Sequence, residues 1–175
     1  MLMGMLAAGG LELLTDGLRT ADPDNPRGYY EYEPTRSLEQ TVDTAWVATA
    51  RGKGVKVISF LLPHLPNTCQ YKIVFVRRDL REVLASQRKM LERRGEPPGD
   101  VADSQMAEMF AGHLVRVEAA LTNRRNCDVL YVDYQAILRT PAALAEQINA
   151  FLGGRLDVAR MAAVVEPALY RNRAE

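Results

Sequence analysis

Three stretches of the chain are mostly apolar at successive positions, with no regular alternation of apolar and polar residues, and are rich in β-branched or aromatic residues. They are residues 55–62 (VKVISFLL), 71–76 (YKIVFV) and 129–132 (VLYV). Strands that are buried on both faces have this pattern, whereas a strand with one face in water alternates apolar and polar positions. The three stretches are therefore predicted to be buried β-strands.

Other stretches have apolar residues at helical spacing and a polar opposite face. This pattern predicts helices over residues 35–50, 80–94, 103–123 and 140–152. Asp103 is expected to cap the third helix, and Thr140 precedes Pro141 as an N-cap precedes a proline in the first helical turn. Buried strands that alternate with amphipathic helices are typical of a mostly parallel sheet covered on both faces. The predicted fold class is three-layer α/β.

The first ten residues are predicted to form an apolar helix that ends at a pair of glycines, of which Gly10 is free to adopt the left-handed conformation. The helix has neither a polar face nor a Ser, Thr, Asp or Asn before it as a cap. Because this is unusual for a helix that opens a domain, we expect the chain to be truncated at its N-terminus. Residues 21–32 and 96–99 are rich in Pro, Gly, Asp or Asn and are predicted to be loops.

Composition limits the classes of protein to which the chain can belong. Its 175 residues fit one domain, and 47% hydrophobic and 25% charged residues are typical of a folded globular protein. The 22 basic residues balance the 22 acidic ones, so a general nucleic-acid binder is disfavoured and any anion site must be local. Two cysteines and two histidines do not make a disulfide framework or a zinc motif. Neither a signal peptide nor a membrane span is recognised, so no membrane partner and a cytoplasmic location are expected.

The richest candidate site lies where the strand at residues 71–76 passes into the next helix. In parallel sheets, ligands bind beyond the carboxyl ends of the strands, where helix N-termini offer N–H groups to anions. Arg78 lies at this strand end, and Ser86 follows it by eight positions in the helix. An arginine there can reach an anion that a serine two turns further along also faces. The alternative is that the basic residues of this segment only cover a solvated helix face.

The segment IVFVRRDLREVLAS at residues 73–86 resembles the 3′-phosphate-binding motif of sulfotransferases of the bacterial type. The resemblance implies that Arg78 and Ser86 hold the 3′-phosphate of 3′-phosphoadenosine-5′-phosphosulfate, the sulfuryl donor. Residues 24–31 (DNPRGYYE) are similar to an Asn-Pro-x-Gly-aromatic-Glu segment of that family. Residues 129–134 resemble a strand of the family with the turn that follows it, and Phe-Leu-Gly at residues 151–153 resembles the end of a family helix. By this analogy Tyr134 lies near the adenine; the alternative is a half-buried aromatic at a strand end.

One element of the family is missing from the sequence. The loop that binds the 5′-phosphosulfate should lie between a first strand and the first helix, just before Met1, so both that strand and its backbone N–H cradle are expected to be absent. We therefore expect the 175-residue chain to bind the donor weakly. Residues 51–54 (RGKG) lack the spacing and the Ser or Thr of a P-loop, and are interpreted as a turn before a strand.

The remaining candidates concern the chemical step. The family's base is a His or a Glu, and Glu31 and His64 are both open here, with Glu31 favoured because two tyrosines precede it in its loop. Lys56 is similar to a family lysine that stabilises charge on the bridging oxygen, although it can also lie at the sheet edge. Arg171 and Arg173 either close over the 3′-phosphate or form a basic tail.

These inferences predict a single sulfotransferase-like domain, residues 1–175, with the fold of P-loop nucleoside-triphosphate hydrolases. Sulfuryl transfer from the donor to a hydroxyl or amine of a small-molecule, glycan or peptide acceptor is expected, without a metal. A small-molecule or nucleotide kinase-like protein is the alternative among enzymes, but the chain has no Gly-Lys-Ser/Thr loop. The other alternative is a remnant of the fold that binds a nucleotide or a partner without turnover.

Overall fold

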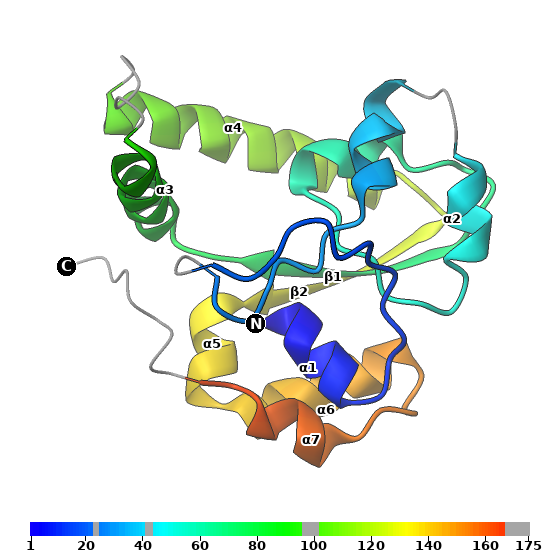
Figure 1. Cartoon of the computed structure of the whole chain (residues 1–175). Coiled ribbons are helices and arrows are strands. Elements are labelled where there is room, and N and C mark those ends of the chain that lie inside the picture. Colours follow the sequence, from blue (N-terminus) through cyan, green and yellow to red (C-terminus); the bar gives the residue numbers. More distant parts are fainter. Residues whose placement is uncertain (23–24, 41–43, 96–101, 167–175) are drawn as a thin grey trace.

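Two of the three predicted strands form the sheet of the protein. The computed structural model describes residues 1–22, 25–40, 44–95 and 102–166. Strand β1 (Tyr71–Arg77) pairs in parallel with β2 (Cys127–Asp133), in a register that runs from Tyr71 opposite Cys127 to Arg77 opposite Asp133 (Figure 1). Both strands therefore end at the same edge of the sheet.

Alternate residues of the two strands belong to two separate hydrophobic cores, one on each face. On one face, Phe75 packs with helix α4 (Asp103–Thr122), the 3₁₀ helix η2 (Ser59–His64) and residues of η1 (Glu33–Gln40) and α2 (Ala45–Thr49). The buried members of this core are Leu38, Val47, Leu61, Leu62, Leu65, Phe75, Val117 and Leu121.

On the other face, Val132 packs with α1 (Leu2–Ala8), α5 (Tyr134–Arg139), α6 (Pro141–Leu152) and α7 (Val158–Ala163). Figure 1 shows these four helices together on the side of the sheet opposite α4. The predicted α/β class is confirmed, and the described sheet is a small parallel one flanked by helices.

The helix that follows β1 begins and ends where the sequence predicts. Helix α3 spans Leu80–Arg94, and the Asp79 carboxylate caps it by accepting a hydrogen bond from the Arg81 backbone N–H at 2.8 Å. Hydrogen bonds from the Arg81 side chain and backbone lower the pKa of Asp79. Gly95 ends the helix with a φ of 67°, in the left-handed region. Arg78 is thereby held at the junction between β1 and α3.

Of the two predicted helix N-caps, one is confirmed and one is wrong. Helix α6 begins at Pro141 with Thr140 as its N-cap residue, as predicted. The cap of α4 is Ala102, not Asp103, which is the first residue of the helix. There the Asp103 carboxylate forms an ion pair with Arg88 of α3, so the acid joins two helices instead of capping one. At the start of the chain, α1 ends before Gly9, and Gly10 adopts a φ of 92° as predicted.

The predicted strand at residues 55–62 is wrong. Residues 55–58, which include Lys56, belong to no helix or strand of the described chain, and residues 59–64 form η2. Only an isolated parallel bridge, Leu13 to Gly54, precedes them. A continuous apolar run of this length fits a buried strand and a buried helical turn equally well. The hydrophobic core decides between them, because Leu61 and Leu62 are buried by packing η2 against α4.

The predicted helix at residues 35–50 is also wrong, since the structure has η1 and α2 there instead of one long helix. In η1 the hydroxyl of Thr35 donates to the Tyr32 carbonyl at 2.8 Å, and that of Ser37 donates to the Pro34 carbonyl at 2.9 Å. Such local side-chain bonds compete with a regular α-helix. Residues 41–43, and the predicted loop at 96–99, lie outside the described residues. Within the described ranges no helix is long and apolar enough to cross a membrane.

Candidate functional site

Two of the predicted donor-binding residues meet at the carboxyl edge of the sheet. Arg78 directly follows β1 and Tyr134 directly follows β2, and the register places the ends of the two strands side by side. The guanidinium carbon of Arg78 lies 4.7 Å from the centre of the Tyr134 ring. Both side chains are half-buried, and that of Arg78 is 24% exposed. A cation beside an aromatic face can serve the phosphate and the base of a nucleotide together.

A buried carboxylate that the sequence analysis did not single out holds this arginine. The Glu82 side chain is 1% exposed, and its Oε2 accepts a hydrogen bond from Arg78 Nε at 3.1 Å. Its Oε1 accepts one from the Gln135 amide at 3.0 Å. The spacing of four between Arg78 and Glu82 is the one signal in the sequence that could have indicated this pair. Charge-assisted bonds of this kind fix the arginine in one orientation.

Ser86 lies one helical turn beyond Glu82, on the same side of α3, because residues four apart in a helix are neighbours on one face. It is half-buried. The structure thus places the serine on the face of α3 that carries the contact with Arg78. Arg171 and Arg173, the other predicted donor contacts, lie outside the described residues.

The two predicted catalytic residues contact each other. Lys56 Nζ lies 3.3 Å from Glu31 Oε1 and also donates to the Tyr29 carbonyl at 3.1 Å. The same carboxylate accepts bonds from Arg19 at 3.3 Å and Arg36 at 3.4 Å, two arginines that the sequence analysis did not single out. Glu31 is 26% exposed, so this group of four charges is partly screened by solvent.

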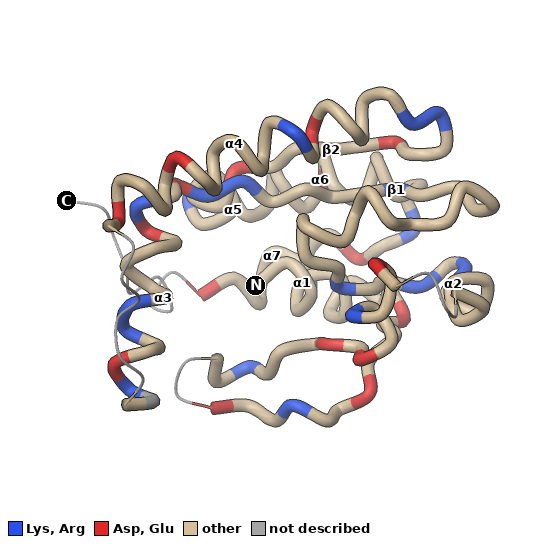
Figure 2. The backbone as a smooth tube through the Cα atoms, turned by 90° about the horizontal axis from the view of Figure 1, so that it is seen from above, with Lys and Arg blue, Asp and Glu red and all other residues tan. Residues whose placement is uncertain are grey.

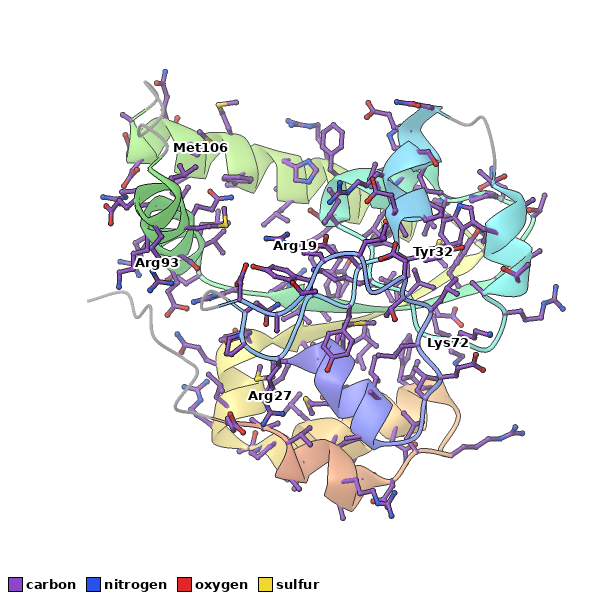
Figure 3. All side chains as sticks on the ribbon, in the orientation of Figure 1. Arg19, Arg27, Tyr32, Lys72, Arg93 and Met106 are labelled. Carbon is purple, nitrogen blue, oxygen red and sulfur yellow. The ribbon has the colours of Figure 1, made fainter. Side chains whose placement is uncertain are left out.

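The loop before Glu31 shapes a small cavity beside these charges. The cavity has a volume of about 130 Å³ and is lined by residues of 15–31, among them Arg19 and Arg27. Figure 3 shows both arginines on the long loop near the start of the chain. Burial, together with the positive charges of Arg27 and Lys56, lowers the pKa of the Met1 amino group. The first turn of α1 therefore faces the same cations.

The backbone of this loop is folded into an uncommon conformation. Gly28 has a φ of 81°, and Tyr30 is the one non-glycine residue of the described chain with a positive φ, 52°. Beside it the Tyr29 hydroxyl donates to Asp22 at 2.6 Å, and burial and this bond raise the pKa of Tyr29. The predicted 21–32 loop is confirmed in its described part.

His64, the alternative base, lies elsewhere. It is the last residue of η2, in a segment that Arg124 fixes by donating to the Pro63 carbonyl at 2.9 Å and to the Leu65 carbonyl. Arg124 precedes β2, so His64 lies near the amino end of the sheet, whereas Arg78 lies at its carboxyl end. The length of the strands, about 20 Å, separates the two ends.

Charges of both signs are mixed along most of the described chain, although α3 has five basic and two acidic residues. In Figure 2 the basic and acidic positions are interspersed along the tube, in agreement with the balanced composition. Over the described ranges, no group of three or more His, Cys, Asp or Glu side chains is arranged to hold a metal ion. An anion is therefore expected to be recognised by individual arginines, and Arg78 is the one that directly follows the last residue of β1.

Comparison with known proteins identifies a family for this chain. The family model described as "Sulfotransferase family" matches residues 29–157, well over half of the chain. The match includes Glu31, Lys56, Arg78, Ser86 and Tyr134. Comparisons with curated proteins and with solved structures find no match. The matched range contains both strands and the junction of β1 with α3, and we conclude that this chain belongs to the sulfotransferase family.

Proposed function

We propose that this protein transfers a sulfuryl group from 3′-phosphoadenosine-5′-phosphosulfate to a hydroxyl or amine. The observation that carries the proposal is the juxtaposition of Arg78 and Tyr134 at the carboxyl edge of the sheet, with Ser86 on the adjoining face of α3. A guanidinium that is half-buried binds a phosphate more strongly than an exposed one, because less water competes for it. Arg78 and Ser86 bind the 3′-phosphate in this proposal, and the Tyr134 ring lies against the adenine.

The chemical step is assigned to the Glu31 and Lys56 pair. The acceptor oxygen or nitrogen attacks the sulfur, the bond from sulfur to the bridging oxygen breaks, and its electron pair stays on the 5′-phosphate of adenosine 3′,5′-bisphosphate. The Glu31 carboxylate takes the acceptor proton, and the Lys56 ammonium offsets the charge that develops on the bridging oxygen. Their separation of 3.3 Å supports this assignment, since both groups must reach the same reacting centre. Arg171 and Arg173 are assigned to the 3′-phosphate on the resemblance alone.

The acceptor is proposed to enter an open hollow of about 620 Å³ beside Glu31. The hollow lies close to Glu31, because Arg36 both lines the hollow and forms an ion pair with the Glu31 carboxylate. The walls include Tyr32 and Trp46, whose rings pack edge to face with centres 5.4 Å apart. In the described part of the chain the buried Trp46 Nε1 has no hydrogen-bond partner. Aromatic walls with a few polar groups suit a small molecule or one unit of a glycan or peptide.

The experiment is calorimetric titration with adenosine 3′,5′-bisphosphate and, separately, with adenosine 5′-phosphate. The unchanged chain should prefer the ligand that carries the 3′-phosphate. Arg78→Ala should weaken its binding by about 2 to 4 kcal/mol, and Ser86→Ala by about 1 kcal/mol, as expected for charge-assisted and neutral hydrogen bonds in a shielded site. Neither change should affect adenosine 5′-phosphate as strongly.

Arg77→Ala is the matched control. Arg77 is the neighbouring arginine, but its guanidinium binds Glu118 at 2.7 Å and lies over the Tyr131 ring, on the other face of the sheet. Its loss should leave the preference for the 3′-phosphate in place. Equal binding of adenosine 3′,5′-bisphosphate by the unchanged chain and by Arg78→Ala would show that the assignment is wrong.

A further inference from the structure

Glu82 is the one charged residue among the described residues whose side chain is fully buried. Burying a carboxylate is unfavourable unless hydrogen bonds and an opposite charge replace the lost water. A helix-surface glutamate at this position of α3 would avoid that cost by facing solvent. The buried position therefore needs an explanation, and the contacts of its two oxygens provide one.

Each oxygen of Glu82 accepts a hydrogen bond from a different segment of the site. Oε2 accepts from Arg78, which follows β1, and Oε1 accepts from Gln135, which follows β2 and is the neighbour of Tyr134. The carboxylate thus joins the two segments that end the parallel strands. Because the guanidinium is planar and rigid, a bond to Nε determines the direction of all its other N–H groups.

We propose that Glu82 is a positioning residue, which orients Arg78 toward the 3′-phosphate of the donor and ties it to the segment that carries Tyr134. This inference rests on the proposed function, because it assumes that Arg78 binds that phosphate. Glu82 itself does not touch the ligand. Its role is to prevent the arginine from rotating into other directions before the donor arrives, which would otherwise lower affinity.

A positioning role and electrostatic repulsion predict opposite effects of Glu82→Gln on the binding of a 3′-phosphate. A negative charge next to a phosphate site repels the phosphate, so by electrostatics alone Glu82→Gln should tighten the binding of a 3′-phosphate. If Glu82 positions Arg78, the same change should weaken binding. The amide of glutamine has a single acceptor oxygen, whereas Arg78 and Gln135 both donate to the carboxylate, so one of the two contacts must be lost.

The test measures the affinity of Glu82→Gln for adenosine 3′,5′-bisphosphate and for adenosine 5′-phosphate. We expect the first to fall about tenfold, as with residues that orient a ligand-binding group, and the second to change less than about twofold. In an Arg78→Ala background, Glu82→Gln should have no further effect on the 3′-phosphate preference, because the group it orients is gone. Glu92→Gln, the same change at an exposed position of α3, is the matched control.

Failure of the proposed function and failure of the positioning role give different results. If the unchanged chain does not prefer the 3′-phosphate, the proposed function fails. If it does, and Arg78→Ala removes the preference while Glu82→Gln keeps or increases it, the positioning role alone is overturned. A loss of both affinities in equal proportion would show a purely structural role and would also overturn it. Should Glu82→Gln not fold, Gln135→Ala decides, since it removes the amide that donates to Oε1 and leaves the Glu82 carboxylate in place. A lower 3′-phosphate preference supports the proposal, and an unchanged one contradicts it.

Discussion

Replacing Tyr134 tests the part of the site that adenine is proposed to occupy. The ring is half-buried at the start of α5, and the Arg78 guanidinium carbon lies 4.7 Å from its centre. Tyr134→Leu removes a cation–π contact of about 0.5 to 2 kcal/mol and a stacked base of about 1 to 3 kcal/mol. Allowing for partial replacement by the leucine, we expect a loss of about 2 kcal/mol, or about thirtyfold in the affinity for adenosine 3′,5′-bisphosphate. Tyr134→Phe keeps the ring and should change the affinity by less than about twofold.

A ligand without the base provides the control for this measurement. Calorimetric titration with ribose 3,5-bisphosphate should show a smaller loss on Tyr134→Leu, because only the support of Arg78 is removed. The free energy of unfolding should change little, since Ile137 is the fully buried residue that anchors α5 in the core. If Tyr134→Leu binds adenosine 3′,5′-bisphosphate as tightly as the unchanged chain, or if Tyr134→Phe loses as much affinity, the ring is not the group that contacts the adenine.

Two further predictions concern the base and the packing of the first helix. In any form of the protein that transfers sulfuryl groups, Glu31→Gln should lower the transfer rate by about a hundredfold while the donor affinity is retained. His64→Ala should change the transfer rate little. Reversed results in a steady-state rate assay would make His64 the base. Gly9→Ala should destabilise the fold by about 1 to 3 kcal/mol in urea denaturation, because its Cβ would lie 2.6 Å from Cγ of the buried Met161. At Gly10 an added Cβ would have no atom within 4 Å, so Gly10→Ala should destabilise the fold by about 1 kcal/mol only through the backbone strain of its φ of 92°. A Gly9→Ala variant as stable as the unchanged chain would contradict the described packing of α1 on α7.

The parts of the fold that could be predicted are those whose local pattern and tertiary surroundings agree. The strands at residues 71–76 and 129–132 are apolar on both faces, and the structure buries them between two cores. Helix α3 has an aspartate before it and a glycine after it, so both ends are encoded locally. The stretch at 55–62 has the same strand-like composition, but residues 59–62 belong to a 3₁₀ helix. This helix buries Leu61 and Leu62 against α4, a distant part of the chain, and leaves Phe60 exposed.

The site was predictable where it depends on topology and not where it depends on burial. The carboxyl ends of parallel strands lie at one edge, so Arg78 and Tyr134 could be brought together by reasoning from strand order. The burial of Glu82 could not be predicted, because a glutamate in a helix is ordinarily solvated and one of its hydrogen-bond partners, Gln135, comes from a distant part of the chain. Likewise, Arg19 and Arg36 reach Glu31 through loops and turns that have no periodic signal.

A crystal structure with adenosine 3′,5′-bisphosphate would show directly whether the carboxyl edge of the sheet holds the 3′-phosphate of the donor. We expect the 3′-phosphate oxygens to lie within hydrogen-bonding distance of the Arg78 guanidinium and the Ser86 hydroxyl, with the adenine against Tyr134. The bond from Arg78 Nε to Glu82 should stay in place, at about its present 3.1 Å. A 3′-phosphate bound by Arg19 or Arg27 instead, with Arg78 unchanged and free of ligand, would show that the proposed donor site is wrong.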